Sequence, residues 1–270
     1  MVRADKKKNT FMSETTNGST AKNDNQSIIR IEDLKRDFIV GSETVHALRG
    51  VTFNINKGEF VAIMGTSGSG KSTMLNILGC LDKPTSGHYY IDGVDAAVCS
   101  KDQLAEIRNK KIGFVFQSYN LLPRTTSIEQ VELPLLYNSN ISAKERRERA
   151  EHALELVGMA NRANHTPNQM SGGQQQRIAI ARAIVNDPVI LLADEATGNL
   201  DTRTSYEIMS LFQKLNEQGV TIGFVTHEPD IALFTKRQVM LRDGKIMKDN
   251  LVETQSAQAA LDALPASSDY

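Results

Sequence analysis

The chain contains no tryptophan, only two cysteines, Cys80 and Cys99, and no apolar run near the roughly 20 residues that a membrane-spanning helix needs. The cysteines have no metal-binding spacing and are too few for a disulfide framework, which is typical of a reducing compartment. The N-terminus lacks the apolar core of a secretory signal. We therefore expect any membrane role to depend on another chain.

An excess of charge is also missing, because 31 Lys and Arg residues balance 32 Asp and Glu residues to a net charge of −1. A chain with so little net charge gives no electrostatic reason to expect nucleic acid as a partner. Its 270 residues suffice for one large α/β domain that contains a second subdomain.

One glycine-rich stretch matches the pattern G-x-x-x-x-G-K-[ST] at every fixed position and comprises Gly65, Thr66, Ser67, Gly68, Ser69, Gly70, Lys71 and Ser72. In this pattern the backbone N–H groups cradle the phosphates of a nucleotide, the lysine reaches the β- and γ-phosphates, and the hydroxyl binds Mg²⁺. An apolar, strand-like run over 60–64 precedes the stretch, and Thr73 belongs to the helix that follows. This context disfavours a chance match in a Gly/Ser turn and predicts a nucleoside triphosphate site.

Two carboxylates end a second apolar run. Residues 189–193 form a continuous run that suits a strand buried on both faces of a parallel sheet, and Asp194 and Glu195 follow it. Carboxylates are costly to bury unless they face a metal or a substrate. Asp194 would hold Mg²⁺ through its water shell, and Glu195 would polarise the water that attacks the γ-phosphate. The alternative, an acidic strand end that meets solvent, is disfavoured by the phosphate-binding loop upstream.

Shortly before that run stands a Ser-Gly-Gly-Gln element, formed by Ser171, Gly172, Gly173 and Gln174. Together with the two motifs above, it resembles the motifs of the ATP-binding-cassette (ABC) ATPases. The resemblance extends from about Ile28 to Met247. The resemblance implies a P-loop α/β cassette with a mostly parallel sheet core, an antiparallel β subdomain and a helical subdomain. It implies ATP and Mg²⁺ as ligands. In this family the Ser-Gly-Gly-Gln element contacts the γ-phosphate held by the opposite subunit, which implies a homodimer. The same residues also form a capping box that starts a helix, and both interpretations can hold together.

Four single residues match further positions of the family. Gln117 corresponds to the glutamine that meets Mg²⁺ and signals to a partner, His227 to the switch histidine near the γ-phosphate, and Asp201 to the loop at the dimer interface. Phe38 stands where an aromatic residue stacks on adenine, although core packing is the alternative. A lone histidine is more often structural, but placement behind strand ends, where open α/β sheets bind ligands, strengthens these assignments. The other histidines have no such placement.

The composition divides the chain into three parts. We expect a disordered polar tail over 1–27, the ABC ATPase domain over 28–250 with its helical subdomain at about 118–187, and a flexible tail over 251–270 with room for one short helix.

Several stretches look like the macrolide-exporter and lipoprotein-releasing (MacB/LolD) branch, including 78–87, 116–123 and 131–137. The chain departs from the branch at Thr66 and Ala196, where proline is usual, and over 124–127. The resemblance implies an ATPase that drives a bacterial complex from the cytoplasmic face of the inner membrane. Its partners would be a separate integral membrane permease, a second copy of the chain and, as a further component, a periplasmic adaptor. We expect no nucleic-acid partner.

Two alternatives remain at this stage. A regulatory ABC ATPase that signals through a membrane protein without transport fits the same motifs, and the sequence does not separate it from a transporter. A soluble ABC protein of translation or DNA maintenance fits less well, because about fifty residues between Gln117 and Ser171 leave no room for a coiled coil. The leucine-rich stretch from Ser118 to Tyr137 is the candidate permease-docking surface, and packing within the helical subdomain is the alternative for its leucines.

Overall fold

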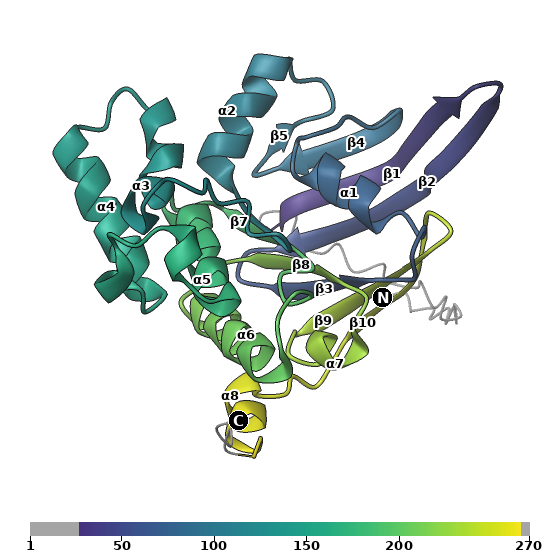
Figure 1. The fold of residues 1–270 in the computed structure, drawn as a ribbon. Coiled ribbons are helices and arrows are strands. Elements are labelled where there is room, and N and C mark those ends of the chain that lie inside the picture. The colour runs from purple at the N-terminus through teal and green to yellow at the C-terminus, as the bar shows by residue number, and fades with distance from the viewer. Residues whose placement is uncertain (1–26, 266–270) are drawn as a thin grey trace, which may run out of the picture.

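The computed structural model describes residues 27–265 and contains two β-sheets (Figure 1). The strands in chain order are β1 (Ser27–Val40), β2 (Glu43–Asn56), β3 (Phe60–Met64), β4 (Ser86–Ile91), β5 (Val94–Asp95), β6 (Ile112–Phe116), β7 (Ile190–Asp194), β8 (Ile222–Thr226), β9 (Arg237–Arg242) and β10 (Lys245–Leu251). One sheet is antiparallel with the order β2-β1-β4-β5. The other has the order β10-β9-β3-β8-β7-β6 and is parallel from β9 to β6. The predicted fold class is confirmed.

Helices surround the parallel sheet. They are α1 (Lys71–Leu78), α2 (Lys101–Lys111), α3 (Ser127–Glu132), α4 (Ala143–Leu156), α5 (Gly172–Ile184), α6 (Thr202–Glu217), α7 (Pro229–Ala232) and α8 (Ala257–Asp262). Short 3₁₀ segments lie at Leu133–Tyr137, Ala160–Arg162 and Pro167–Gln169. No helix in residues 27–265 combines the length and apolar character needed to cross a membrane.

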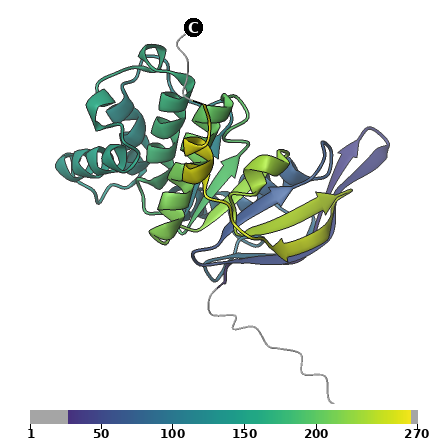
Figure 2. The ribbon, with the colours of Figure 1, turned by 90° about the horizontal axis from the view of Figure 1, so that it is seen from below.

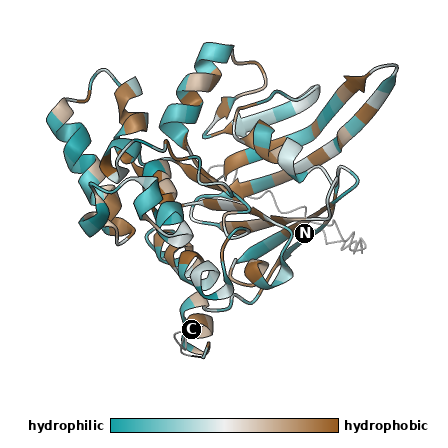
Figure 3. Ribbon diagram, in the orientation of Figure 1, coloured by the Kyte–Doolittle hydropathy of each residue, from teal (hydrophilic) through white to brown (hydrophobic). Residues whose placement is uncertain are grey.

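The central strands are buried on both faces, as their continuous apolar runs require. Leu191 of β7 and Phe224 of β8 belong to the core that contains α5 and α6. Their neighbours Leu192 and Val225 belong to the core that contains α1 and the antiparallel sheet. Successive side chains of a strand point to opposite faces, so one short run serves two cores. Figure 3 shows these strands as predominantly hydrophobic.

The helical region extends from one side of the parallel sheet (Figure 1). Helix α4 begins at Ser142, whose Oγ accepts a hydrogen bond from the Glu145 amide at 3.2 Å. Helix α5, at the end of the predicted helical subdomain, packs both on α3 and α4 and on strand β6. It therefore connects that subdomain with the sheet.

One helix was not predicted, and another lies in the segment for which a short helix was expected. Helix α2 was not anticipated, although a capping box of Ser100 and Gln103 marks its start. Helix α8 lies in the predicted flexible tail, yet Ala257 is fully buried and α8 packs along α6 (Figure 2). Gln213 of α6 accepts a hydrogen bond from the Ala257 amide at 2.9 Å. The described part of that tail is therefore packed on the domain, whereas the predicted N-terminal tail, apart from Ser27, lies outside the described residues.

Candidate nucleotide site

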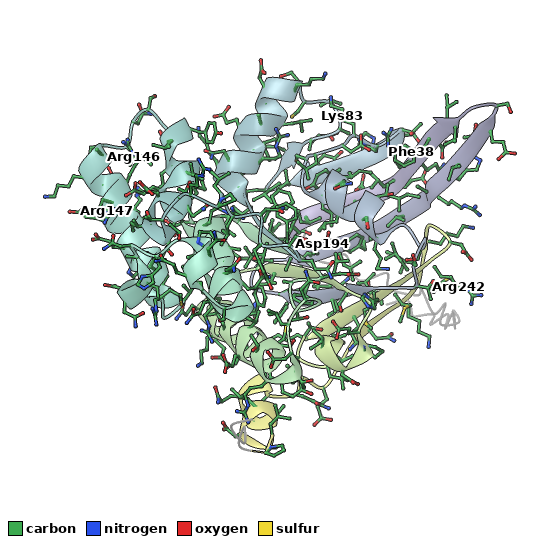
Figure 4. The ribbon with its side chains drawn as sticks, viewed as in Figure 1. Phe38, Lys83, Arg146, Arg147, Asp194 and Arg242 are labelled. Atoms are coloured by element: carbon green, nitrogen blue, oxygen red, sulfur yellow. The ribbon has the colours of Figure 1, made fainter. Side chains whose placement is uncertain are left out.

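A cavity of about 1250 Å³ opens at the carboxyl ends of β3, β7 and β8, beside the first turn of α1. Ligands of open α/β sheets bind at this edge. Most of the residues that the sequence predicts line this cavity, namely Gly65, Thr66, Ser67, Gly68, Gly70, Lys71, Ser72, Thr73, Gln117, Asp194, Glu195 and His227. Ser69, also a residue of the loop, is buried and does not line the cavity. Asp194 is labelled in Figure 4.

The glycine-rich loop turns its backbone toward the cavity. Gly70, the residue before α1, has a left-handed φ of 103°, and a Cβ there would lie 2.7 Å from the Ala47 carbonyl oxygen. At Gly65 a Cβ would overlap the Leu241 carbonyl oxygen. Only glycine combines this conformation with such close approach. The loop is therefore held against β2 and the end of β9, in the kind of turn whose backbone amides can bind phosphate oxygens.

Lys71 supplies the positive charge of the loop. Its side chain lies beneath the loop, with the residue only 8% exposed, and its Nζ donates to the carbonyl oxygens of Gly65 at 2.7 Å and Thr66 at 2.9 Å. These bonds hold the ammonium group at the cavity, where it can interact with phosphate oxygens.

The carboxylates after β7 have contrasting surroundings. Burial raises the pKa of Asp194, the neighbouring charge of Glu195 raises it further, and Lys71 opposes both effects. Glu195 has a left-handed φ of 45°, which is uncommon for a residue with a side chain. Its Oε1 lies 2.8 Å from Nδ1 of His227, which follows β8, so the neighbouring strand ends bring together two residues 32 positions apart.

Gln117 follows β6 and is tied to the loop that precedes α6. Its Nε2 donates to Oδ1 of Asn199 at 3.2 Å, and Nδ2 of Asn199 donates to the Gln117 carbonyl oxygen at 3.1 Å. Asn199 is a residue to which the sequence analysis assigned no role. Its only sequence signal is its position two residues before Asp201.

Three residues of the cavity wall carry oxygen atoms that suit Mg²⁺, namely Ser72, Gln117 and Asp194. Among the described residues, no group of three or more His, Cys, Asp and Glu side chains is arranged to hold a metal ion. Mg²⁺ usually binds through one or two carboxylates together with phosphates and waters. The donor set therefore fits an ion that binds with a nucleotide.

The Ser-Gly-Gly-Gln element and Asp201 are not part of the cavity lining. Ser171 caps α5, with its Oγ accepting from the Gln174 amide at 3.3 Å while Gln174 Oε1 accepts from the Ser171 amide at 3.1 Å. Asp201 caps α6, and its hydrogen bonds with Thr204 lower the pKa of the Asp201 carboxyl group. Gly173 packs so close to Thr204 that a Cβ there would overlap the threonine methyl group.

Phe38 does not line the cavity either. It pairs with Val45 across the β1–β2 hairpin, and the Arg36 guanidinium lies 4.4 Å from its ring centroid. The residues of β2 that do line the cavity include Val45, His46 and Arg49. The sequence does not predict them as cavity residues, because no motif marks them and only the hairpin places them there.

Fold and cavity together define a P-loop nucleotide-binding protein. The family model described as "ABC transporter" matches residues 48–198. The chain belongs to this family and is an ABC transporter ATP-binding subunit with ATPase activity.

Its relatives include the ABC transporter ATP-binding protein YknY of Bacillus subtilis, 54% identical over 220 residues that cover 82% of this chain and 95% of YknY. The macrolide export ATP-binding/permease protein MacB of Syntrophobacter fumaroxidans is 51% identical over 221 residues, which cover 81% of this chain and 31% of MacB. The dimeric structure of MJ0796 in a post-hydrolysis state with ADP and Pi is 48% identical, with a TM-score of 0.76, and the match covers 84% of this chain and all of that one. The expected branch is confirmed.

We predict that Lys71→Ala weakens ATP binding about 10- to 100-fold, because the loop loses a charged hydrogen-bond donor to the phosphates. A fluorescence titration with a nucleotide analogue measures this. Lys57→Ala, at an exposed position that does not line the cavity, is the control and should bind like the unmodified chain. Equal affinity for all three proteins would contradict the site.

Proposed function

We propose that this chain powers a bacterial inner-membrane ABC transporter of the export or mechanotransmission type. In this proposal it dimerises on ATP and docks on a separate permease at the cytoplasmic face of the membrane. The main support is the division of its motifs, because the loop and the hydrolytic residues line one cavity whereas Ser171 and Asp201 do not. One copy would thus carry one half of its own site, at the cavity, and the complementary half of its partner's site, at Ser171 and Asp201.

Hydrolysis in this proposal depends on Glu195 as the general base. Its carboxylate would orient and polarise the attacking water, and the hydrogen bond to His227 would keep that carboxylate in place. Lys71 would offset phosphate charge, while Ser72, Gln117 and Asp194 would hold Mg²⁺, which supplies further charge stabilisation. Phosphoryl transfer mainly requires such positioning and electrostatic stabilisation.

The start of α5 would complete the site of a second copy. Ser171 is exposed there, and a helix N-terminus presents free amides and a favourable dipole to anions. The relative MJ0796 is described as dimeric with ADP and Pi. A head-to-tail pair would therefore place Ser171 and Gly173 of one copy against the phosphates at Lys71 of the other.

The stretch Ser118–Tyr137 would contact the permease. Its leucines differ in exposure, since Leu135 is fully buried, whereas Leu122 is 50% and Leu136 57% exposed. Beside it lies a groove of about 340 Å³, whose lining includes Phe116 at the end of β6 and Tyr137. Exposed apolar side chains around a groove indicate a contact surface, and Phe116 adjoins Gln117 of the nucleotide cavity.

We predict that Glu195→Gln retains ATP binding but lowers turnover at least about 100-fold, because the amide cannot act as the base. Size-exclusion chromatography with ATP should show the variant trapped as a dimer. Rapid phosphate release by this variant would remove Glu195 from its proposed role.

We predict that Lys71→Ala and Ser171→Arg chains, each inactive alone, regain activity when mixed. A head-to-tail heterodimer has one site with both lesions and one with neither, so about half of the paired chains' sites become competent. Phosphate release from the mixture measures this, and affinity tags on each variant verify that heterodimers form. If verified heterodimers are as inactive as their parents, the shared-site model is wrong.

We predict that Leu122→Glu lowers the amount of membrane protein that copurifies with the chain, because a charge at a contact surface loses its solvation. ATPase activity of the isolated chain should stay within about twofold, because half of Leu122 is exposed and it does not line the cavity. Leu156→Glu, at a leucine of α4 that is 39% exposed, is the matched control. Equal copurification of both variants would place the docking surface elsewhere.

A further inference from the structure

Helix α5 contacts the segment after Glu195 of its own chain through Gln176, which lies in its second turn. Gln176 is fully buried, and its Nε2 donates to the Ala196 carbonyl oxygen at 2.7 Å. Ala196 directly follows Glu195 and is itself 1% exposed. The helix that Ser171 caps is therefore joined by a buried hydrogen bond to the carbonyl group of the residue that follows the proposed general base.

The choice of an amide at this position is costly if Gln176 only fills space. Its Oε1 is buried and has no hydrogen-bond partner among residues 27–265. An unpaired buried acceptor destabilises a fold, and an apolar side chain of similar volume, such as methionine, would avoid that penalty. The bond from Nε2 to Ala196 is the contribution that methionine would not make.

The segment that receives this bond needs support. Glu195 holds a left-handed φ of 45°, and such conformations persist where the surroundings determine them. The Glu195 amide donates to the Val225 carbonyl oxygen at 2.9 Å, and the Glu195 carbonyl accepts from the Gly198 amide at 2.9 Å. Residue 196 is alanine, so no proline ring restricts its φ. Gln176 restrains the next peptide along the chain, between Ala196 and Thr197, and these bonds together hold the backbone on both sides of Glu195.

We propose that Gln176 is a positioning residue for ATP hydrolysis. Its amide keeps the Glu195–Ala196 backbone in place, so that the Glu195 carboxylate stays at His227 and at the cavity. The start of helix α5 would contact the partner's nucleotide, and Gln176 of the same helix holds the backbone next to the hydrolytic carboxylate of its own chain. This inference rests on the function proposed above for Glu195 and Ser171.

Gln176→Met tests the proposal, because it keeps the volume and removes the donor. We expect kcat for ATP to fall about tenfold, the rate equivalent of one such hydrogen bond, with KM and nucleotide affinity unchanged. Gln175→Met is the matched control on the next residue of the same helix. Its Nε2 donates to the carbonyl oxygens of Pro167 and Met170, both at 3.1 Å, and not to the catalytic segment. We expect its kcat to stay within twofold of the unmodified chain.

Thermal unfolding of each variant verifies that it is folded at the assay temperature. If Gln176→Met is not folded, Gln176→Leu, which also lacks the donor, replaces it. The Gln176 variant and Gln175→Met are then assayed at a temperature below the lower of their two unfolding midpoints. A kcat within twofold of the unmodified chain, or an equal fall in Gln175→Met, overturns the proposal. A fall in affinity with unchanged kcat also overturns it.

Glu195→Gln, assayed in parallel, separates this inference from the proposed function. If Glu195→Gln hydrolyses ATP rapidly, the assignment of Glu195 fails and the positioning role fails with it. If Glu195→Gln is inactive while Gln176→Met has the kcat of the unmodified chain, only the role of Gln176 is wrong.

Discussion

Three adjacent parallel strands, β3, β8 and β7, are buried on both faces, and the nucleotide cavity depends on them. Burial on both faces requires helices or a second sheet on each side. Helices α5 and α6 cover one face, and α1 with the antiparallel sheet covers the other, so that two separate cores form. Because the strands run in one direction, their carboxyl ends meet at one edge. The phosphate-binding loop, the two carboxylates and His227 thus arise from different strands and lie at one place.

That edge concentrates groups that would destabilise an ordinary core. Lys71 is nearly buried, the pKa of Asp194 is raised mainly by burial, and Glu195 has a left-handed backbone. Carbonyl oxygens of the loop accept hydrogen bonds from Lys71, and His227 bonds to Glu195. The grouping of one ammonium and two carboxylates at one edge is best explained by a ligand with negative phosphates and a divalent cation. Polar groups held in unfavourable surroundings are characteristic of sites prepared for a charged reaction.

The same chain also carries proposed site residues that do not line its own cavity. Helix α5 starts at the exposed Ser171 and makes its buried contact with Ala196 through Gln176. It also packs against β6 and against α3 and α4 of the helical region. In the proposed dimer, one rigid element would therefore touch the partner's phosphates, the hydrolytic segment of its own chain and the subdomain beside the permease. Backbone hydrogen bonds join each turn of such a helix to the next, so these contacts are held at fixed spacings along one axis.

Local patterns in the sequence determined the loop at 65–72, the carboxylates at 194–195 and the helix start at Ser171, because each depends on neighbouring residues and on backbone conformations with short-range signatures. Pattern alone did not place Asn199 against Gln117, 82 positions away, or Val45 and His46 in the cavity in place of Phe38. Nor did it show the packing of α8 on α6 or the contact of Gln176 with Ala196. Those contacts follow from strand order, hairpin register and helix packing, which join residues far apart in the chain and which only the tertiary structure decides.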